Sequence, residues 1–360
     1  MDVSRSTPTR RRGSMSEIDP YQTIFEDIKK RLDDPSVIYT LHEKVAKFDP
    51  IPSDISVVDE VLNGGLPEGR IIEIFGPEAS GKTTLTLHFI AAAQRRNYVV
   101  YFIDAEQALD TAYAERIGVK LDKLMFSQPD YGEQALETAR AICEATEAAR
   151  QKHKDQDIKS LIVIDSIPAL VPKQAFETYE KDGFDATVAL GSQARMLSQL
   201  LPPLVNKAGK AGVTVVFINQ ERDKIGVSYG SPTTTPGGRA VKFFSSLRLK
   251  VARIGYYDRG GERAGIRTHM LPIKSKLFPI FGRKAEFIIG PDGINQYAAL
   301  AETLISKGLA TKKGAWIKVD ELSYQGLPKF EDELRENGEF RTVMLERLGA
   351  LSTQVELKKA

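Results

Sequence analysis

Residues 71–90 read IIEIFGPEASGKTTLTLHFI, and this stretch decides the fold of the domain that contains it. Residues 71–75 form an apolar run that predicts a buried strand, and residues 84–90 have the composition of a helix. A phosphate-binding loop stands between them, with the sequence Gly76-Pro77-Glu78-Ala79-Ser80-Gly81-Lys82-Thr83. Its glycines let backbone N–H groups surround a polyphosphate, and the following helix directs its positive dipole end at the same anion.

The last two residues of this loop carry the chemistry of a nucleotide site. Lys82 can reach the β- and γ-phosphates, and Thr83 can supply a hydroxyl to Mg²⁺. A chance match on a surface loop is the alternative, and the strand before the loop and the helix after it argue against that alternative. A kinase would also need a closing lid and a site for an acceptor, and the sequence has a signature of neither. The loop therefore predicts a nucleotide-binding protein.

The bulk composition is that of an ordinary soluble globular protein. The 360 residues include 50 basic and 48 acidic side chains, so the net charge is only +2 and any affinity for nucleic acid must come from local clusters. The single cysteine, Cys143, cannot form an intramolecular disulfide and fits a reducing compartment. No apolar run approaches the ~20 residues that cross a bilayer, and no secretory signal is visible. We expect a cytoplasmic protein with no membrane partner.

The pattern divides the chain into four parts. Residues 1–15 are basic and poor in apolar side chains, which predicts a disordered tail. Residues 16–50 form an arm, in which apolar residues recur at helical spacing from Pro20 to about Lys47. Residues 51–295 form the main domain. From about Gln296 the pattern changes to a helix over 298–307 and then, beyond Trp316, to polar helices, which predicts a small C-terminal domain over 296–360.

The main domain is predicted to be α/β, with a mostly parallel central sheet covered by helices on both faces. Its apolar strands alternate with longer helical patterns, which is typical of this class. Four strand signals form the centre, and each ends in polar residues: 71–75 in the phosphate loop, 98–103 in Asp104-Ala105-Glu106, 161–164 in Asp165-Ser166, and 213–218 in Asn219-Gln220. Since ligands of parallel sheets bind beyond the carboxyl ends of strands, we expect these groups to converge on one nucleotide. Two further strands are predicted over 247–254 and 285–289.

Three of these strand-end residues have candidate roles. Asp165 is expected to hold Mg²⁺ opposite Thr83. Glu106 is a candidate to orient or deprotonate the water that attacks the γ-phosphate, and the alternative is a carboxylate that interacts with a helix N-terminus. Gln220 carries donors and an acceptor, so it can sense the γ-phosphate and transmit that state to the long Gly/Pro/Thr-rich segment that follows it.

Several stretches, taken in order, resemble the bacterial RecA-type recombinases. The resemblance is continuous from about Ile51 to Gly293 and extends weakly through Gly314-Ala315-Trp316. The matching motifs are the phosphate loop through Thr84, Phe102–Asp110, Ser127–Asp130 with Gly132–Leu136, Phe217–Gln220 with Lys224–Val227, Thr233–Thr235 followed by Gly237-Gly238, and Lys274-Ser275-Lys276.

The resemblance implies a RecA-type P-loop ATPase core with an N-terminal arm that docks on a neighbouring subunit and a small α+β C-terminal domain. Subunits of this family polymerise as a helical filament on single-stranded DNA and pair it with a homologous duplex, using ATP and Mg²⁺. The expected function is thus DNA recombination and repair, with DNA damage and the SOS response as its setting and a homo-oligomer as its working form. Partners that load the filament, or repressors that it acts on, cannot be identified from these motifs.

The same resemblance assigns roles to individual residues. Glu106 matches the catalytic carboxylate, Asp165 the second acidic motif and Gln220 the γ-phosphate switch. Lys274 and Lys276 match a pair that the adjacent subunit supplies to the γ-phosphate. The nucleotide contacts are expected from Gly76, Pro77, Glu78, Ala79, Ser80, Gly81, Lys82, Thr83 and Thr84, with Asp110 and Tyr113 at the adenine, and the subunit contacts from Lys242 and Phe243.

Two segments with little periodicity, about 176–190 and 221–239, match the DNA-facing loops of the family. Basic residues in such loops contact phosphates, glycines allow close approach of the backbone, and an apolar side chain can wedge between bases. The expected DNA-binding residues are Leu190, Gly191, Arg195, Arg222, Lys224, Ile225, Gly226, Gly237, Gly238 and Arg239.

The sequence also departs from the family pattern. Leu190 stands where a methionine is typical, and Glu221 and Asp223 bring carboxylates into the second loop, where they should weaken phosphate binding unless they pair with Arg222 and Lys224. The turn 290–293 lacks the usual tyrosine, and the C-terminus lacks an acidic tail. These differences suggest a divergent member, such as one encoded by a bacterial virus. A regulatory or mediator ATPase of the same fold, and a ring-forming helicase, are the alternative functions.

Overall fold

The computed structural model describes residues 19–33, 50–154, 156–182, 191–223, 233–259 and 261–357, the last eight of these by backbone alone. The chain forms two compact units, residues 1–48 and residues 49–360. In the first unit, helix α1 (Pro20–Arg31) begins at Asp19, whose side chain accepts the Tyr21 N–H, and ends in three basic residues that suit the negative end of the helix dipole. This helix confirms the helical pattern predicted from Pro20. The predicted tail, 1–15, and residues 16–18 and 34–49 of the arm lie outside the described residues.

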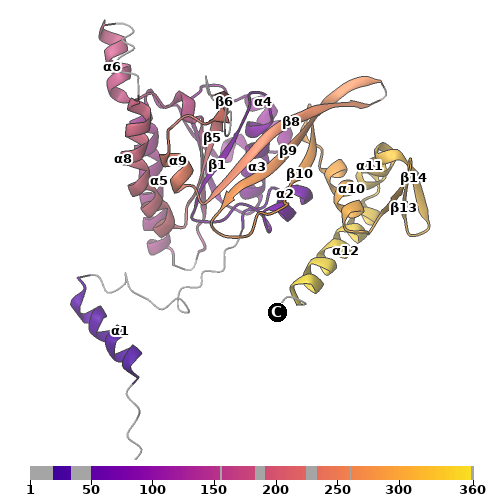
Figure 1. Cartoon of the computed structure of the whole chain (residues 1–360), viewed down its shortest axis with the longest axis horizontal. Coiled ribbons are helices and arrows are strands. Elements are labelled where there is room, and N and C mark those ends of the chain that lie inside the picture. The colour runs from indigo at the N-terminus through magenta and orange to yellow at the C-terminus, as the bar shows by residue number, and fades with distance from the viewer. Residues whose placement is uncertain are drawn as a thin grey trace, which may run out of the picture. The chain divides into compact units, whose positions relative to one another are not determined.

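The second unit is built on one large mixed sheet (Figure 1). Within the described residues the strand order is β11-β10-β9-β8-β1-β5-β4-β2-β3. Strands β8, β1, β5, β4, β2 and β3 pair in parallel, while β9, β10 and β11 continue the sheet in antiparallel fashion. The bounds are β1 Ile71–Gly76, β2 Val99–Asp104, β3 Leu124–Ser127, β4 Ser160–Asp165, β5 Thr214–Gln220, β8 Leu247–Arg259, β9 Glu262–Ser275, β10 Ala285–Gly290 and β11 Gly293–Ile294. The predicted, mostly parallel sheet is confirmed.

Helices cover both faces of this sheet. Successive residues of a strand point to opposite faces, so each central strand contributes side chains to two hydrophobic cores. Leu161 and Val163 pack into one hydrophobic core, whereas Ile162 and Ile164 of the same strand pack into the other. The first core lies under α2 (Ser56–Val61), α3 (Lys82–Arg95) and α4 (Thr111–Ile117). The second lies under α5 (Gly132–Lys152), α8 (Ser192–Ala211) and α9 (Ala240–Phe244), and Figure 1 shows α5 and α8 along one side of the sheet. Burial on both faces explains the continuous apolar runs of the central strands.

The C-terminal part has a third hydrophobic core of its own. Helix α10 (Gln296–Ser306) leads into three antiparallel strands, β12 (Thr311–Lys313), β13 (Trp316–Val319) and β14 (Leu322–Gln325), and then into α11 (Gly326–Glu336) and α12 (Gly338–Leu357). The expectation of polar helices beyond Trp316 was therefore wrong for residues 316–325. Ile317 and Val319 alternate with exposed residues along β13, which is the signature of a short half-buried strand.

The segment predicted to be irregular over 176–190 is partly helical. Helix α6 spans Lys173–Asp182, and its Phe176 packs against Tyr131. Its few apolar residues hid the helical period from the sequence. Residues 183–190 lie outside the described part. Within the second irregular segment, β6 (Arg222–Asp223) and β7 (Thr233–Thr234) form a short antiparallel pair.

Two single turns of 3-10 helix, η2 (Leu121–Lys123) and η3 (Ile167–Ala169), complete the described elements. None of the helices among the described residues has the length and the apolar character needed to cross a membrane.

Candidate active site

The phosphate loop leaves the end of β1, near the middle of the sheet, and enters α3. Gly81 adopts φ +94°, and a Cβ added there would lie 2.2 Å from the Ile289 Cδ1. A Cβ on Gly76 would lie 1.9 Å from the Val251 carbonyl oxygen of β8. Both positions therefore require glycine, one for its backbone conformation and both for space. The Ser80 hydroxyl is buried in this loop and has no hydrogen-bond partner in the described part of the chain, so it can bind an anion held by the loop.

Lys82 lies in the first turn of α3 and is only 8% exposed. Its ammonium donates to the Pro77 carbonyl at 2.6 Å. Burial lowers the pKa of this lysine, while the carboxylates of Asp165, Glu106 and Glu78 act in the opposite direction. A phosphate would supply the negative charge that a buried ammonium lacks. The lysine is thus held inside the loop, at the place where the sequence predicted it.

Thr83 and Asp165 meet as predicted, although 82 residues separate them in the sequence. The Thr83 hydroxyl donates to the Asp165 carboxylate at 3.0 Å. Burial raises the pKa of Asp165 to about 7; the hydrogen bond from Thr83 and the Lys82 charge oppose the rise, and the Glu106 and Asp104 carboxylates add to it. A divalent cation between this hydroxyl and this carboxylate would relieve the cost of the buried charge, so the two oxygens fit a magnesium site.

Glu106 lies beside the same pair. Asp104 and Asp165 are partners in the β2–β4 register, and the Glu106 N–H donates to the Asp165 carbonyl at 3.1 Å. The Ser166 hydroxyl donates to the Glu106 carboxylate at 2.7 Å. The Asp104 carboxylate holds the loop after β2, since it accepts the N–H groups of Ala108 and Leu109. The sequence analysis named Ser166 among the polar strand ends but gave it no role of its own. Its position directly after Asp165 was the available signal.

Gln220 ends β5 opposite Gly76, the first residue of the phosphate loop. Its neighbour Asn219 is fully buried and is hydrogen-bonded through both the nitrogen and the oxygen of its amide. The Asn219 amide donates to the Glu73 carboxylate at 2.8 Å and to the Pro236 carbonyl at 3.1 Å, and its oxygen accepts the Gln220 N–H at 2.9 Å. The ends of β1, β2, β4 and β5 thus bring Lys82, Asp165, Glu106 and Gln220 to one edge of the sheet, as predicted.

The two residues expected near an adenine start α4. Asp110 is its N-cap and accepts the Tyr113 N–H at 2.9 Å, so its carboxylate has a structural contact as well. The Tyr113 hydroxyl lies 3.2 Å from that of Thr84 in α3. Arg116 of the same helix donates to the Pro291 carbonyl at 3.4 Å, which brings the turn 290–293 close to α4 although its usual tyrosine is missing.

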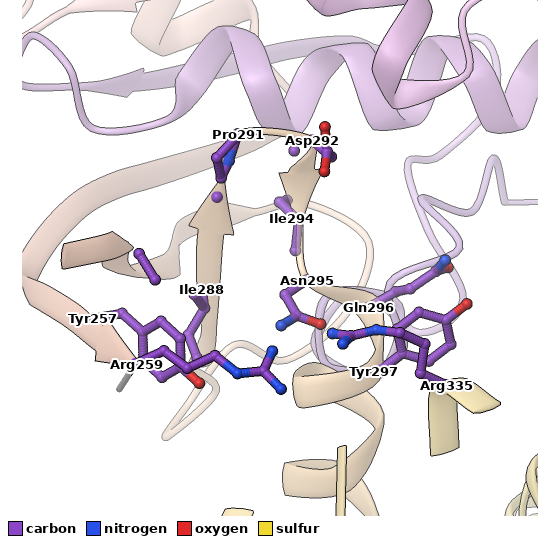
Figure 2. Close-up of a pocket in the computed structure, with 13 residues that line it drawn as sticks. Tyr257, Arg259, Ile288, Pro291, Asp292, Ile294, Asn295, Gln296, Tyr297 and Arg335 are labelled. Atoms are coloured by element: carbon purple, nitrogen blue, oxygen red, sulfur yellow. The ribbon is translucent and has the colours of Figure 1, made fainter. Parts of the chain in front are cut away.

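The other side of that turn borders a cavity of about 530 Å³ (Figure 2). Tyr257 and Arg259 of the β8–β9 hairpin line one side of it, and Tyr297 and Arg335 line the other. Both arginines form ion pairs with Glu331 and Asp332 of α11. Arg259 therefore joins the hairpin to the C-terminal part, whereas the Arg335 pairs lie within α11. None of the predicted nucleotide contacts lines this cavity.

Lys274 and Lys276 lie toward the amino ends of the parallel strands, whereas the phosphate loop lies at their carboxyl ends. Ser275 between them pairs with Leu247 at the start of β8, and β8 runs parallel to β1. The Lys274 ammonium donates to the Lys242 and Phe243 carbonyls at 2.7 and 3.0 Å, and that of Lys276 to the Phe243 carbonyl at 3.1 Å. In the strand register Ser275 is level with Ile72, which lies four residues, or about 13 Å at ~3.3 Å per residue, before Gly76 and the chain's own phosphate loop.

The arrangement is that of a P-loop nucleotide site on a RecA-like sheet, and the comparison with protein families agrees. A model of the RecA N-terminal domain matches residues 21–295. The chain belongs to the RecA family. The curated Protein RecA of Aquifex aeolicus is 42% identical over 321 residues, 88% of each chain. Protein RecA of Thermus thermophilus is 43% identical over 84% of this chain and 86% of its own. That of Rubrobacter xylanophilus is 44% identical over 79% and 80%.

The RecA resemblance found in the sequence is therefore confirmed, and the chain is a RecA-type recombinase. Four of the residues expected to bind DNA lie together. Gly191 caps α8 with φ +75°, exposed Arg195 lies in the first turn of that helix, and a Cβ on Gly238 would lie 2.9 Å from that of Ala194. Arg239 is exposed beside Gly238. Leu190, Lys224, Ile225 and Gly226 lie outside the described residues.

The remaining expected residues of this RecA surface flank that group. Arg222 is exposed in β6, and the Gly237 backbone, at φ +85°, packs against Leu197 of α8. The Lys242 ammonium donates to the Thr234 hydroxyl at 2.8 Å, while the side chain of Phe243 is 69% exposed. Glu221 is paired with two residues that the sequence analysis did not consider as its partners. Its carboxylate accepts from Lys250 at 2.8 Å and from the Thr233 hydroxyl at 2.5 Å.

Proposed function

We propose that this RecA-family chain binds ATP and Mg²⁺ at the phosphate loop, assembles as a helical filament on single-stranded DNA, and exchanges that strand with a homologous duplex while it hydrolyses ATP. The observation that carries the proposal is the convergence of Lys82, Asp165, Glu106 and Gln220 at the ends of four neighbouring strands. Each has the chemistry of a distinct step: phosphate binding, metal binding, activation of water, and sensing of the γ-phosphate.

The protein's own oxygens account for part of a magnesium shell. Thr83 and Asp165 would hold the ion, which when bound supplies positive charge to the phosphate oxygens. The described residues contain no cluster of three or more histidine, cysteine or acidic side chains that could enclose a metal. The remaining ligands would therefore be phosphate oxygens and water, as is usual for Mg²⁺. The buried Ser80 hydroxyl supports an anion in the same loop.

Glu106 would orient the attacking water and accept its proton. The Ser166 hydroxyl donates to its Oε2 at 2.7 Å, which fixes the direction of the carboxylate and leaves Oε1 to face a water. The proton passes from water to this oxygen as the water oxygen approaches the γ-phosphorus. Lys82 would neutralise charge on the phosphate oxygens during the same step.

The neighbouring subunit would complete the site. Lys274 and Lys276 lie toward the amino end of β1, and their ammonium groups donate to the Lys242 and Phe243 carbonyls instead of pointing to their own phosphate loop, which supports their action on the nucleotide of an adjacent subunit. Head-to-tail contacts that do not close on themselves generate helical filaments. We assign the arm, residues 16–50, and exposed Phe243 to this contact, the core to residues 51–295, and a separate C-terminal domain to residues 296–360.

The DNA would run along the N-terminus of α8 and the chain that precedes α9. Arg195, Arg222 and Arg239 are exposed there and can contact phosphates. Phosphate contacts carry little information about sequence, so we expect weak sequence preference and a strong dependence of affinity on salt. The sequence of the bound strand would be read by base pairing with the incoming duplex.

Purified protein tests this function directly. With ATP, Mg²⁺ and single-stranded DNA, the chain should form filaments visible by electron microscopy, show hydrolysis stimulated by DNA, and exchange strands. Lys82→Ala should abolish both hydrolysis and exchange. Glu106→Gln should lower hydrolysis by about 10²–10⁴-fold yet retain ATP-dependent filaments, because binding does not need the base. Filaments without exchange would point to a regulatory ATPase, and closed rings with unwinding activity to a helicase; either outcome would overturn the proposal.

A further inference from the structure

Glu221, the residue directly after the proposed γ-phosphate sensor, is held at three points. Its N–H donates to the Gly76 carbonyl at 3.0 Å, where the phosphate loop begins. Its carboxylate accepts from the Lys250 ammonium of β8 at 2.8 Å and from the Thr233 hydroxyl of β7 at 2.5 Å. One residue therefore joins the phosphate loop, the sheet, and the chain that returns toward α9.

The ion pair is partly protected from water. The side chain of Glu221 is 9% exposed and that of Lys250 is 30% exposed. Lys250 lies opposite Phe75 of β1 in the strand register, so it belongs to the rigid centre of the sheet. Pairs of this kind resist separation more than surface pairs, because breaking one leaves a charge in a poorly solvated position. The contact thus fixes Thr233 relative to the strand that carries the phosphate loop.

The residue on the other side of Gln220 holds the same returning chain. Asn219 donates to the Pro236 carbonyl at 3.1 Å and accepts the Gln220 N–H at 2.9 Å. Gln220 therefore lies between two residues that both contact the segment Thr233–Arg239. This segment ends in Gly238 and Arg239 beside α8, where the DNA contacts are proposed. Both chain neighbours of Gln220 thus link it to this segment.

We propose that Glu221 and Lys250 form a positioning pair that transmits the nucleotide state at Gln220 to the DNA-binding segment Thr233–Arg239. The proposal rests on the proposed function of the site. The competing view is electrostatic: Glu221 is one more carboxylate near DNA phosphates, and its removal simply strengthens DNA binding in every nucleotide state. The two views differ in whether the effect depends on the nucleotide.

The experiment measures the affinity of the full chain for a fluorescent single-stranded oligonucleotide, with ADP and with a non-hydrolysable ATP analogue. The ratio of the two affinities is the coupling between nucleotide and DNA. Glu221→Ala and Lys250→Met should each reduce this ratio by about five- to tenfold. The matched control is Asp223→Ala, which removes the same charge from an exposed position two residues away and should change the ratio by less than about twofold. Melting temperatures verify that each variant is folded.

A charge exchange separates positioning from general structure. The double variant Glu221→Lys with Lys250→Glu restores an ion pair at the same place, so it should recover at least half of the lost ratio, whereas each single reversal should not. If Glu221→Ala and Asp223→Ala raise affinity equally with both nucleotides and preserve the ratio, the positioning pair is refuted and the recombinase proposal is untouched. If the wild-type chain binds DNA with the same affinity in the presence of either nucleotide, both the positioning pair and the recombinase proposal are overturned.

Discussion

His88 shows at the scale of one residue how the helix after the phosphate loop is joined to the edge of the sheet. Its Nε2 accepts the Ile294 N–H of β11 at 2.8 Å, so the ring must be neutral at that nitrogen. Burial lowers the pKa of His88 to about 4; the nearby charge of Arg95 adds to this and Asp54 opposes it. Protonation would replace the acceptor by a second donor facing the Ile294 N–H.

This histidine should make the folded chain sensitive to mild acid. Its pKa is lower in the folded state than in the unfolded state, so its stabilising contribution is complete above pH ~6.5 and is lost as the pH falls toward about 4. Between pH 7 and pH 5 we expect a loss of about 2 kcal/mol from this group. His88→Gln places an amide oxygen near the Nε2 position and should remove that loss. Urea unfolding at the two pH values checks this; equal losses in both proteins would contradict it.

The sequence predicted which candidate site residues lie together better than it predicted the side chains that contact and orient them. Lys82, Thr83 and Asp165 follow strands, and polar groups at the ends of adjacent parallel strands must share an edge. The Ser166 contact to Glu106 and the Lys250 contact to Glu221 depend on tertiary packing, which no spacing encodes. For the same reason the sequence suggested Arg222 and Lys224 as partners of Glu221, since they are its neighbours along the chain, whereas Lys250 is its neighbour in space.

Helices and strands were predicted where buried positions give a clear pattern of apolar residues in the sequence, and were missed where that pattern is weak. The central strands are apolar on both faces and were recognised. Strand β3 was missed because it lies at the sheet edge with Met125 and Phe126 about half exposed. The long strand β9 was missed because polar residues and Pro272 interrupt it, and Pro272 lies beside a register shift where its missing N–H is tolerated.

At the scale of elements, we expect Phe330 to stabilise the C-terminal part and not the central sheet. Its side chain is fully buried, with ring centroids 5.1 Å from Tyr324 and 6.4 Å from Phe340. Phe330→Ala should cost about 3–5 kcal/mol by leaving a cavity in this third core. Hydrogen exchange should rise across 297–344 and stay unchanged in β1 and β5, with nucleotide binding preserved. Phe281→Ala, at a fully exposed position, is the control. Equal loss of protection in the central strands would show that residues 296–360 are not a separate domain.

The whole molecule presents a phosphate loop at one edge of its sheet and Lys274 with Lys276 at the other. Under the proposed function, each subunit donates these lysines to a neighbour and receives those of another copy at its own nucleotide. The positions of Lys274 and Lys276 were predicted only from the family resemblance. Their end of the sheet is set by the antiparallel pairing of β9 with β8, which the spacing of residues does not reveal.

Mixed filaments should therefore recover activity that neither parent has. Lys82→Ala subunits lack a working phosphate loop but keep both lysines, and subunits with Lys274→Ala and Lys276→Ala keep the loop but lack the lysines. In an equal mixture, about one quarter of the head-to-tail junctions would combine an intact loop with intact lysines. DNA-stimulated ATP hydrolysis should rise accordingly, measured by phosphate release. A mixture of Lys82→Ala with the triple variant offers no such junction and should remain inactive. If the first mixture is equally inactive although mixed filaments form, the lysines do not act between subunits.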